Sequence, residues 1–268
     1  MNVVITGGSK GIGLGMAREF LKRGHSVAIC SRSQGDVDAA IAVLEAESSA
    51  DLIVTGTECD VSNYEQVQNL WDVAAKDMGS VDIWINNAGR DGQKKLFTDL
   101  PPEDFKMTVD TNLTGLMNCC HVVMRAMAAQ DSGGRIFNME GFGSDGMTRP
   151  RLGVYGSTKY ALKYLTKTLA KEVDGSNVRM CYLSPGMVVT DLLVPPPEER
   201  DEDWEKSKKV LNILADTVDT VTPYLVDGIL AAEKNGDAVR WLSGGKVMWR
   251  FMTARFGKKR DLFSHLGA

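Results

Sequence analysis

The sequence alternates short apolar runs with longer stretches of helical period, and this alternation restricts the possible folds more than any other feature. Runs that are apolar throughout are typical of strands buried on both faces of a parallel sheet. The pattern predicts one α/β domain, a doubly wound parallel sheet with helices on both faces. The expected strands span 2–6, 26–31, 52–60, 81–89, 134–139, 178–186 and 238–244, and the expected helices span about 12–24, 35–49, 63–78, 102–130, 155–174 and 217–234.

Composition and charge exclude several classes of protein. Hydrophobic residues make up 43% and charged residues 25%, as in an ordinary globular chain. The net charge of -4 argues against nucleic acid as a partner. No apolar run reaches the roughly 18 residues of a membrane-spanning helix, and the N-terminus shows no targeting pattern, so we expect a cytoplasmic protein. The histidines and cysteines form no ligand motif, so we expect buried thiols and no metal site.

Two segments depart from the alternation. The run 192–209 contains three consecutive prolines and many charges, which is typical either of a solvated insertion or of a substrate lid. We expect a lid at about 190–212 within a domain spanning 1–245, because the segment follows the sixth strand, where open α/β sheets bind ligands. The tail 246–268 mixes aromatic with basic residues and predicts either a packed tail or a peripheral membrane contact.

The segment "TGGSKGIG" (6–13) joins the first expected strand to the first expected helix. Glycines in that setting allow a tight turn and a close approach of the backbone to a pyrophosphate. The free N–H groups and the dipole of the helix then favour the phosphate charge. The segment therefore predicts a dinucleotide site.

The spacing of Gly7, Gly11 and Gly13 follows the pattern TGxxxGxG, and five further motifs occur in a characteristic order. These are "CDVS" (59–62), "NNAG" (86–89), "DTNLTG" (110–115), "YGSTK" (155–159) and "SPGMVVTD" (184–191). With them the chain resembles the short-chain dehydrogenase/reductase family along nearly its whole length. The resemblance implies a Rossmann-like fold and a nicotinamide dinucleotide. The positions implied or derived as cofactor-binding are Gly7, Ser9, Lys10, Gly11, Ile12, Gly13, Ser31, Arg32, Asp60, Val61, Asn87, Ala88, Gly89, Tyr155, Lys159, Pro185, Gly186, Val188 and Thr190.

The end of the second strand distinguishes NADP from NAD. A carboxylate there would bind the ribose 2′-hydroxyl, whereas a cation accommodates a 2′-phosphate. The strand ends with Ser31 and Arg32, and Lys10 stands in the glycine loop. A guanidinium can bind a phosphate through two hydrogen bonds, so the sequence favours NADP(H) over NAD(H).

Tyr155 and Lys159 share one face of a helix because they stand four residues apart. Lowering the pKa of a phenol from about 10 to about 7 needs about 4 kcal/mol, and a nearby ammonium, aided by an oxidised nicotinamide, is an adequate source. By resemblance, Tyr155 exchanges a proton with the substrate oxygen, Lys159 lowers its pKa and holds the nicotinamide ribose, and Asn112 supports a proton-relay water.

The family pattern has a serine before the tyrosine that binds the substrate oxygen, and this chain lacks it. Counting back from Tyr155, the place falls on Gly141 or Phe142. Loss of such a donor costs about 2.7 to 4 kcal/mol, so a substitute is expected. Ser144 is favoured because its neighbouring glycines allow the loop to fold back; the alternatives are Glu140, backbone N–H groups or no donor.

The segments "NMEGFGSDG", "VYGSTK" and "LNILADTVDTV" are similar to those of chlorophyll b reductases of the non-yellow-coloring type. This resemblance implies NADPH-dependent reduction of the 7-formyl group of chlorophyll b, a step of chlorophyll catabolism. The alternatives are a general ketone or aldehyde reductase, an alcohol dehydrogenase, and a dinucleotide-sensing regulator with weak activity. The family usually forms homo-tetramers or homo-dimers through the helices at 102–130 and 155–174, which we expect here.

Overall fold

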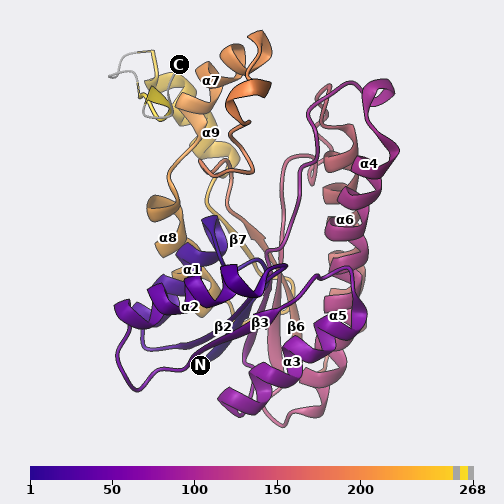
Figure 1. Ribbon diagram of the computed structural model, residues 1–268, viewed down its shortest axis with the longest axis vertical. Coiled ribbons are helices and arrows are strands. Elements are labelled where there is room, and N and C mark those ends of the chain that lie inside the picture. The colour runs from indigo at the N-terminus through magenta and orange to yellow at the C-terminus, as the bar shows by residue number, and fades with distance from the viewer. Residues whose placement is uncertain (256–259, 265–268) are drawn as a thin grey trace.

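The computed structural model describes residues 1–255 and 260–264. Its centre is a seven-stranded sheet in the order β3-β2-β1-β4-β5-β6-β7, and every neighbouring pair is parallel (Figure 1). The predicted doubly wound α/β fold is confirmed. The strands are β1 (Asn2–Ile5), β2 (Ser26–Ser31), β3 (Val54–Glu58), β4 (Ile83–Asn86), β5 (Gly134–Met139), β6 (Val178–Ser184) and β7 (Ala238–Arg240).

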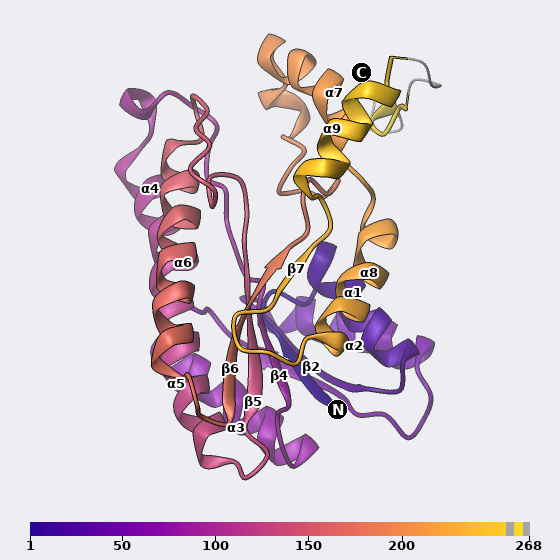
Figure 2. The same ribbon diagram turned by 180° about the vertical axis from the view of Figure 1, so that it is seen from behind.

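Helices cover both faces of the sheet. Helices α1, α2 and α8 lie on one face, and α3 to α6 lie on the other, which Figure 2 shows from behind. The helices are α1 (Gly11–Lys22), α2 (Gln34–Glu47), α3 (Tyr64–Met78), α4 (Pro102–Val109), α5 (Gly115–Ala129), α6 (Gly153–Glu172), α7 (Glu202–Leu214), α8 (Val218–Ala231) and α9 (Gly244–Thr253). Short 3-10 turns span Phe97–Asp99 and Pro197–Glu199.

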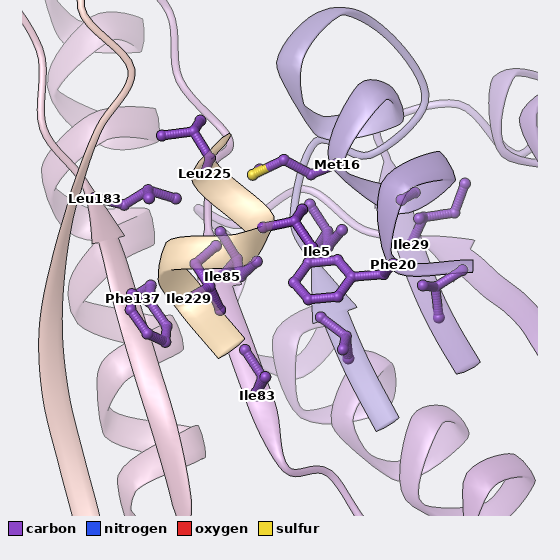
Figure 3. Packing of buried hydrophobic residues seen from close by; sticks show 14 of the residues in the cluster. Ile5, Met16, Phe20, Ile29, Ile83, Ile85, Phe137, Leu183, Leu225 and Ile229 are labelled. Carbon is purple, nitrogen blue, oxygen red and sulfur yellow. The ribbon is translucent and has the colours of Figure 1, made fainter. Parts of the chain in front are cut away.

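The two faces of the sheet carry separate apolar cores because successive side chains of a strand point to opposite sides. In β1, Val3 and Ile5 join the core under α1, α2 and α8, whose packing Figure 3 shows, whereas Val4 joins the core under α3, α5 and α6. Phe20 and Trp84 are fully buried in the first and second core respectively. The cores hold the carboxyl ends of the strands in fixed positions along one edge.

The expected helix at 102–130 is wrong as a single element. It divides into α4, a π-helical turn at Asp110–Thr114, and α5. A π-helical turn holds an extra residue, which changes the direction of the side chains that follow, and such turns are frequent at functional sites. Here the turn contains Asn112, which is buried.

The charged run after the prolines forms helix α7 and is not a structureless insertion. The side chain of Asp201 accepts a hydrogen bond from the backbone N–H of Trp204 and caps the helix, and acidic residues fill its first turn, where the helix dipole favours them. Helices α7 and α9 lie side by side beyond the sheet (Figures 1 and 2). Trp204 packs edge-on against Phe263 with ring centres 5.4 Å apart.

Helix α9 begins before residue 245 and ends after it, so it crosses the expected boundary between domain and tail. Residues 256–259 and 265–268 of that tail lie outside the described residues. The five cysteines are buried free thiols, as predicted. Within 1–255 and 260–264, no helix combines the length and the apolar character that a membrane crossing requires.

Candidate active site

Helix α6 places Tyr155 and Lys159 beside the carboxyl end of β5. Lys159 is buried, and its Nζ donates a 2.9 Å hydrogen bond to the carbonyl oxygen of Met139, the last residue of that strand. The same Nζ lies 5.8 Å from the centre of the Tyr155 ring. The two side chains that the spacing predicted to share a helix face are therefore close together.

Gly141 stands against the Tyr155 phenol, where the family pattern has a serine. A Cβ atom built on Gly141 would lie 2.3 Å from Oη of Tyr155 and 3.2 Å from Cε of Lys159. A side chain cannot occupy this space while the phenol does. Of the two positions that counting left open, Gly141 is thus the one that faces the tyrosine.

Ser144 folds back toward Gly141. Its Oγ accepts a 3.0 Å hydrogen bond from the N–H of Gly141, and its own N–H donates to the carbonyl oxygen of Gly141 at 3.1 Å. The turn needs Gly143 because φ there is 94°, and because a Cβ atom would lie 2.6 Å from Cα of Gly156. The Ser144 hydroxyl is buried beside the position where the usual serine is missing.

Burial dominates the proton affinities of the pair. It lowers the pKa of Lys159 to about 8, and the negative charge of Glu140 partly opposes this effect. Burial also raises the pKa of Tyr155, and the negative charge of Asp91 adds to the increase. We expected Lys159 to lower the pKa of the phenol. This effect of Lys159 stays a prediction, because in the chain without a dinucleotide burial and Asp91 dominate the pKa of Tyr155, and the Lys159 ammonium donates to Met139.

Asn112 points inward from the π-helical turn. Its Oδ1 accepts a 2.8 Å hydrogen bond from the N–H of Arg90, and its Nδ2 donates to the Arg90 carbonyl at 2.7 Å and to Oγ1 of Thr158 at 3.1 Å. Asn112 and Lys159 line the same cavity of about 10 Å³. This volume is close to the minimum that one water needs, which suits the relay expected at Asn112.

The glycine loop fits a dinucleotide pyrophosphate. Gly7 and Gly11 have φ angles of 64° and 56°, in the left-handed region, and a Cβ atom on Gly13 would lie 2.3 Å from the carbonyl oxygen of Gly7. Lys10 precedes α1, and among the described residues its side chain makes no capping hydrogen bond to the helix. The first N–H groups of α1 are therefore available to an anion.

Arg32 is exposed immediately after β2, and the structure gives it no ion pair among the residues it describes. Ser31 is turned toward its own chain, since its Oγ donates to the Ser33 carbonyl oxygen at 3.0 Å. Lys10 is also exposed, but it pairs with Asp191 at 3.5 Å. The binding of a phosphate by Arg32 stays a prediction.

The other expected cofactor positions surround the same edge of the sheet. Asn87 Nδ2 donates to the carbonyl oxygens of Thr6 and Gly7 at 2.9 and 3.0 Å, which joins the end of β4 to the glycine loop. Asp60 follows β3, and its carboxylate accepts hydrogen bonds from the N–H and hydroxyl of Ser62. The remaining positions lie just before α1 (Ser9), in the first turn of α1 (Ile12), after β3 (Val61), after β4 (Ala88, Gly89) and after β6 (Pro185, Gly186, Val188, Thr190).

The segment after β6 borders a cavity of about 460 Å³, lined by Val189, Thr190, Asp191, Val194, Pro195, Pro196 and Arg200. Contacts join this segment and α7 to the loops around the site. Lys94 Nζ donates to the Leu193 carbonyl at 3.1 Å, and Arg151 pairs with Asp201 at 2.7 Å. These contacts agree with the expected lid, whose function stays a prediction.

Three residues near the site were not assigned a leading role from the sequence. Asp91 stands two residues after "NNAG", its negative charge raises the pKa of Tyr155, and Lys94 pairs with it at 3.1 Å. Glu140 was considered only as an alternative to Ser144. A signal was present for Glu140, because a charged residue at the end of an apolar strand is unusual unless it is paired.

Comparison with known proteins adds a family. Residues 1–201 match the short chain dehydrogenase family. Over 98% of its length the chain is 40% identical to "Chlorophyll(ide) b reductase NOL, chloroplastic" of Arabidopsis thaliana and covers 76% of that protein. Over 94% of its length it is 38% identical to "Probable chlorophyll(ide) b reductase NYC1, chloroplastic" of the same plant, of which it spans 53%.

The solved structure of levodione reductase superposes with a TM-score of 0.79 over 91% of this chain and 97% of that one. The sequence identity is 23%, so this likeness shows the fold alone. The names of the two Arabidopsis relatives place those proteins in the chloroplast, which contradicts the cytoplasmic location expected from the sequence. The chain belongs to the short-chain dehydrogenase family, whose members bind NAD(P)(H), and it is an oxidoreductase that acts on carbonyl or CH–OH groups.

Proposed function

We propose that the protein reduces the 7-formyl group of chlorophyll b to a hydroxymethyl group with NADPH. The observation that carries this proposal is the 40% identity, over nearly the whole chain, to a protein named chlorophyll(ide) b reductase. The segment "NMEGFGS" supports it, because Gly141 and Ser144 replace the usual serine in the way the resemblance implies.

In the proposed reaction the carbonyl carbon receives a hydride and the carbonyl oxygen receives a proton. When bound, the nicotinamide supplies the hydride. Tyr155 donates the proton, and its raised pKa keeps the phenol protonated in the free protein. The Lys159 ammonium lies 5.8 Å from the Tyr155 ring and stabilises the phenolate that forms. A water in the small cavity between Lys159 and Asn112 would return the proton to Tyr155.

Ser144 would bind the carbonyl oxygen of the substrate. Its Oγ already accepts the hydrogen bond from the Gly141 N–H, so its own proton can be donated outward. A donor that is fixed before the substrate arrives needs little reorganisation when charge develops on the oxygen. This role for Ser144 is supported by the position of the hydroxyl next to Gly141, the residue that contacts Tyr155.

The preference for NADPH over NADH rests on Arg32. Its guanidinium is exposed at the end of β2, the place at which dinucleotide-binding folds meet the adenine ribose. Assembly through α5 and α6 into dimers or tetramers also stays a proposal. The exposed Met117, Tyr160 and Tyr164 support it, because these large side chains lie on those helices.

The test is NADPH oxidation by the purified protein with chlorophyll b, followed by chromatography of the pigment product. Chlorophyll a, which carries a methyl group at the same ring position, is the matched control and should not be reduced. A panel of smaller aldehydes and ketones tests the alternative of a general reductase. If NADPH binds and no carbonyl compound is reduced, the sensor alternative replaces the proposal.

A further inference from the structure

Glu140 is a buried carboxylate at the centre of the catalytic end of β5. Only 5% of its surface is exposed. Its N–H donates a 2.7 Å hydrogen bond to the Leu183 carbonyl, which fixes its backbone against β6. It stands between Met139, which accepts the hydrogen bond from Lys159, and Gly141, which contacts Tyr155. The mechanism proposed above gives this residue no task.

Glu140 forms two ion pairs, both of them long. Oε1 lies 3.8 Å from Nζ of Lys163 on α6, and Oε2 lies 3.5 Å from Nε of Arg240 at the end of β7. Both cations are partly exposed, and Oε1 has no hydrogen-bond partner among the described residues. A buried carboxylate oxygen without a hydrogen bond is costly, so the retention of Glu140 beside the site calls for a benefit. Its field is also weakly screened and acts on neighbouring charges.

The position of helix α6 determines which neighbouring charge the field of Glu140 acts on. The helix runs along β5 so that Lys163 approaches Glu140 and Lys159, one turn earlier, approaches Met139. The titratable groups near Lys159 are Tyr155 and Lys163 on its own helix, Glu140 at the end of β5, and the Cys119 thiol of α5, which lines the same small cavity. Of these, Glu140 is the group whose negative charge favours the Lys159 ammonium.

We propose that Glu140 is a positioning residue that keeps the buried Lys159 ammonium charged, so that Lys159 can stabilise the Tyr155 phenolate. The effect of Glu140 on turnover rests on the proposed reductase function, whereas its effect on the titration of Lys159 can be measured without it. The lowered pKa of Lys159, about 8, makes the ammonium sensitive to such help, because the group would otherwise lose its proton close to neutral pH.

A purely structural role would also explain burial, since Glu140 joins β5 to α6 and β7. The two roles predict different changes in the titration of Lys159. If Glu140 is only a tether, then Glu140→Gln and Lys163→Met break the same contact and should affect Lys159 alike. If Glu140 acts by its charge, Glu140→Gln removes a negative charge near Lys159, whereas Lys163→Met removes a positive one, and the two variants should move the titration of Lys159 in opposite directions.

The experiment follows the Cε resonance of Lys159 by NMR in protein labelled with ¹³C at the ε-carbon of lysine, as a function of pH. The signal is assigned by its absence in Lys159→Arg. In Glu140→Gln the titration midpoint should fall by about one pH unit, at the low end of what a neighbouring opposite charge exerts. In Lys163→Met it should rise. An unchanged midpoint in Glu140→Gln, or a fall in both variants, would overturn the proposal.

Turnover gives a second measurement. Activity should decline as pH rises through the Lys159 midpoint, so the alkaline limit of the Glu140→Gln profile should move to lower pH, and Glu140→Asp should restore it in part. If no substrate is reduced, the proposed function fails and the NMR titration still decides the role of Glu140. Should Glu140→Gln not fold, Lys163→Met and Arg240→Met carry the test. Each should raise the Lys159 midpoint, and a fall in either would contradict the proposal.

Discussion

Gly141 and Tyr155 are in direct contact, because a Cβ atom on the glycine would lie 2.3 Å from the phenol oxygen. The chain has a glycine where the family pattern has a serine, and the missing side chain leaves room for the Tyr155 phenol. The Tyr155 phenol occupies the volume that a serine side chain would need, and the hydroxyl of Ser144 enters from the loop beyond.

The first prediction concerns this contact. Gly141→Ser should not restore the family pattern but should displace the Tyr155 ring, because the new Cβ and the phenol oxygen cannot both fit. The free energy of unfolding should fall by about 1–3 kcal/mol, the usual cost of overpacking, and turnover should be lost. Thermal unfolding and NADPH oxidation measure both effects.

Gly153→Ala is the matched control for Gly141→Ser. Gly153 begins α6, the helix that carries Tyr155, and a Cβ atom built on Gly153 meets no atom of the described residues within 4 Å. Its stability and activity should stay near those of the parent protein. A Gly141→Ser variant with unchanged turnover would show that Tyr155 moves without consequence, and the geometry described for the site would then be wrong.

The fold could be predicted from the sequence because its central strands β1, β2 and β4 are largely apolar, and such runs favour an arrangement that buries both faces of a sheet. Val3, Val4 and Ile5 show this in three successive residues, since the middle one enters a different core from its neighbours. The glycine loop could also be predicted, because a side chain at Gly13 would collide with the carbonyl oxygen of Gly7.

The parts that failed depend on distances that a sequence does not contain. The π-helical turn contains Asn112, whose hydrogen bonds join it to Arg90, 22 positions away. The raised pKa of Tyr155 in the chain alone depends on burial and on Asp91, and the spacing to Lys159 reveals neither of these. The charged run after the prolines did not reveal helix α7, whose first turn Asp201 caps.

Tyr155→Phe should abolish reduction and leave cofactor binding intact. The phenol supplies the proton in the proposed reaction, whereas the ring itself fills the space beside Gly141 and is retained in phenylalanine. NADPH affinity from fluorescence titration should match that of the parent protein while turnover is absent. Unchanged turnover in this variant would rule out Tyr155 as the proton donor.

Ser144→Ala should lower kcat by about 10²-fold or more, the scale observed when one oxyanion donor is removed. The loop should keep its course, since Gly143 and the hydrogen bond from the Ser144 N–H to Gly141 remain. Ser157→Ala, at an exposed position of α6, is the matched control and should be silent. Parent-like kinetics in Ser144→Ala would transfer the role to backbone N–H groups.

Arg32→Asp should weaken NADPH binding far more than NADH binding. The substitution places a carboxylate where a 2′-phosphate would lie, and a carboxylate can instead accept hydrogen bonds from the 2′-hydroxyl of NADH. The same change at Arg179, which is exposed near the opposite end of β6, controls for the change in net charge. Equal losses for the two dinucleotides in Arg32→Asp would contradict the assignment.

Because the Lys159 ammonium is buried, we expect Lys159 to lower the stability of the folded protein while it supports activity. Its pKa falls from 10.5 to about 8 in the folded chain, so between these values the unfolded state binds more protons and stability rises with pH. Below the folded pKa both states are charged and the full cost of burying the ammonium is present. Replacing the charge by an apolar side chain removes this cost, up to about 3 kcal/mol.

Lys159→Met should therefore be inactive yet more stable than the parent protein at neutral pH. Its advantage should shrink as pH rises from about 8 and should vanish near 10.5, where Lys159 is neutral in both states. Denaturant unfolding across this range measures the difference, with Lys171→Met at an exposed position of α6 as the control. An advantage that is independent of pH would indicate better packing instead, and a loss of stability at neutral pH would mean that the hydrogen bond to Met139 outweighs the cost of burial.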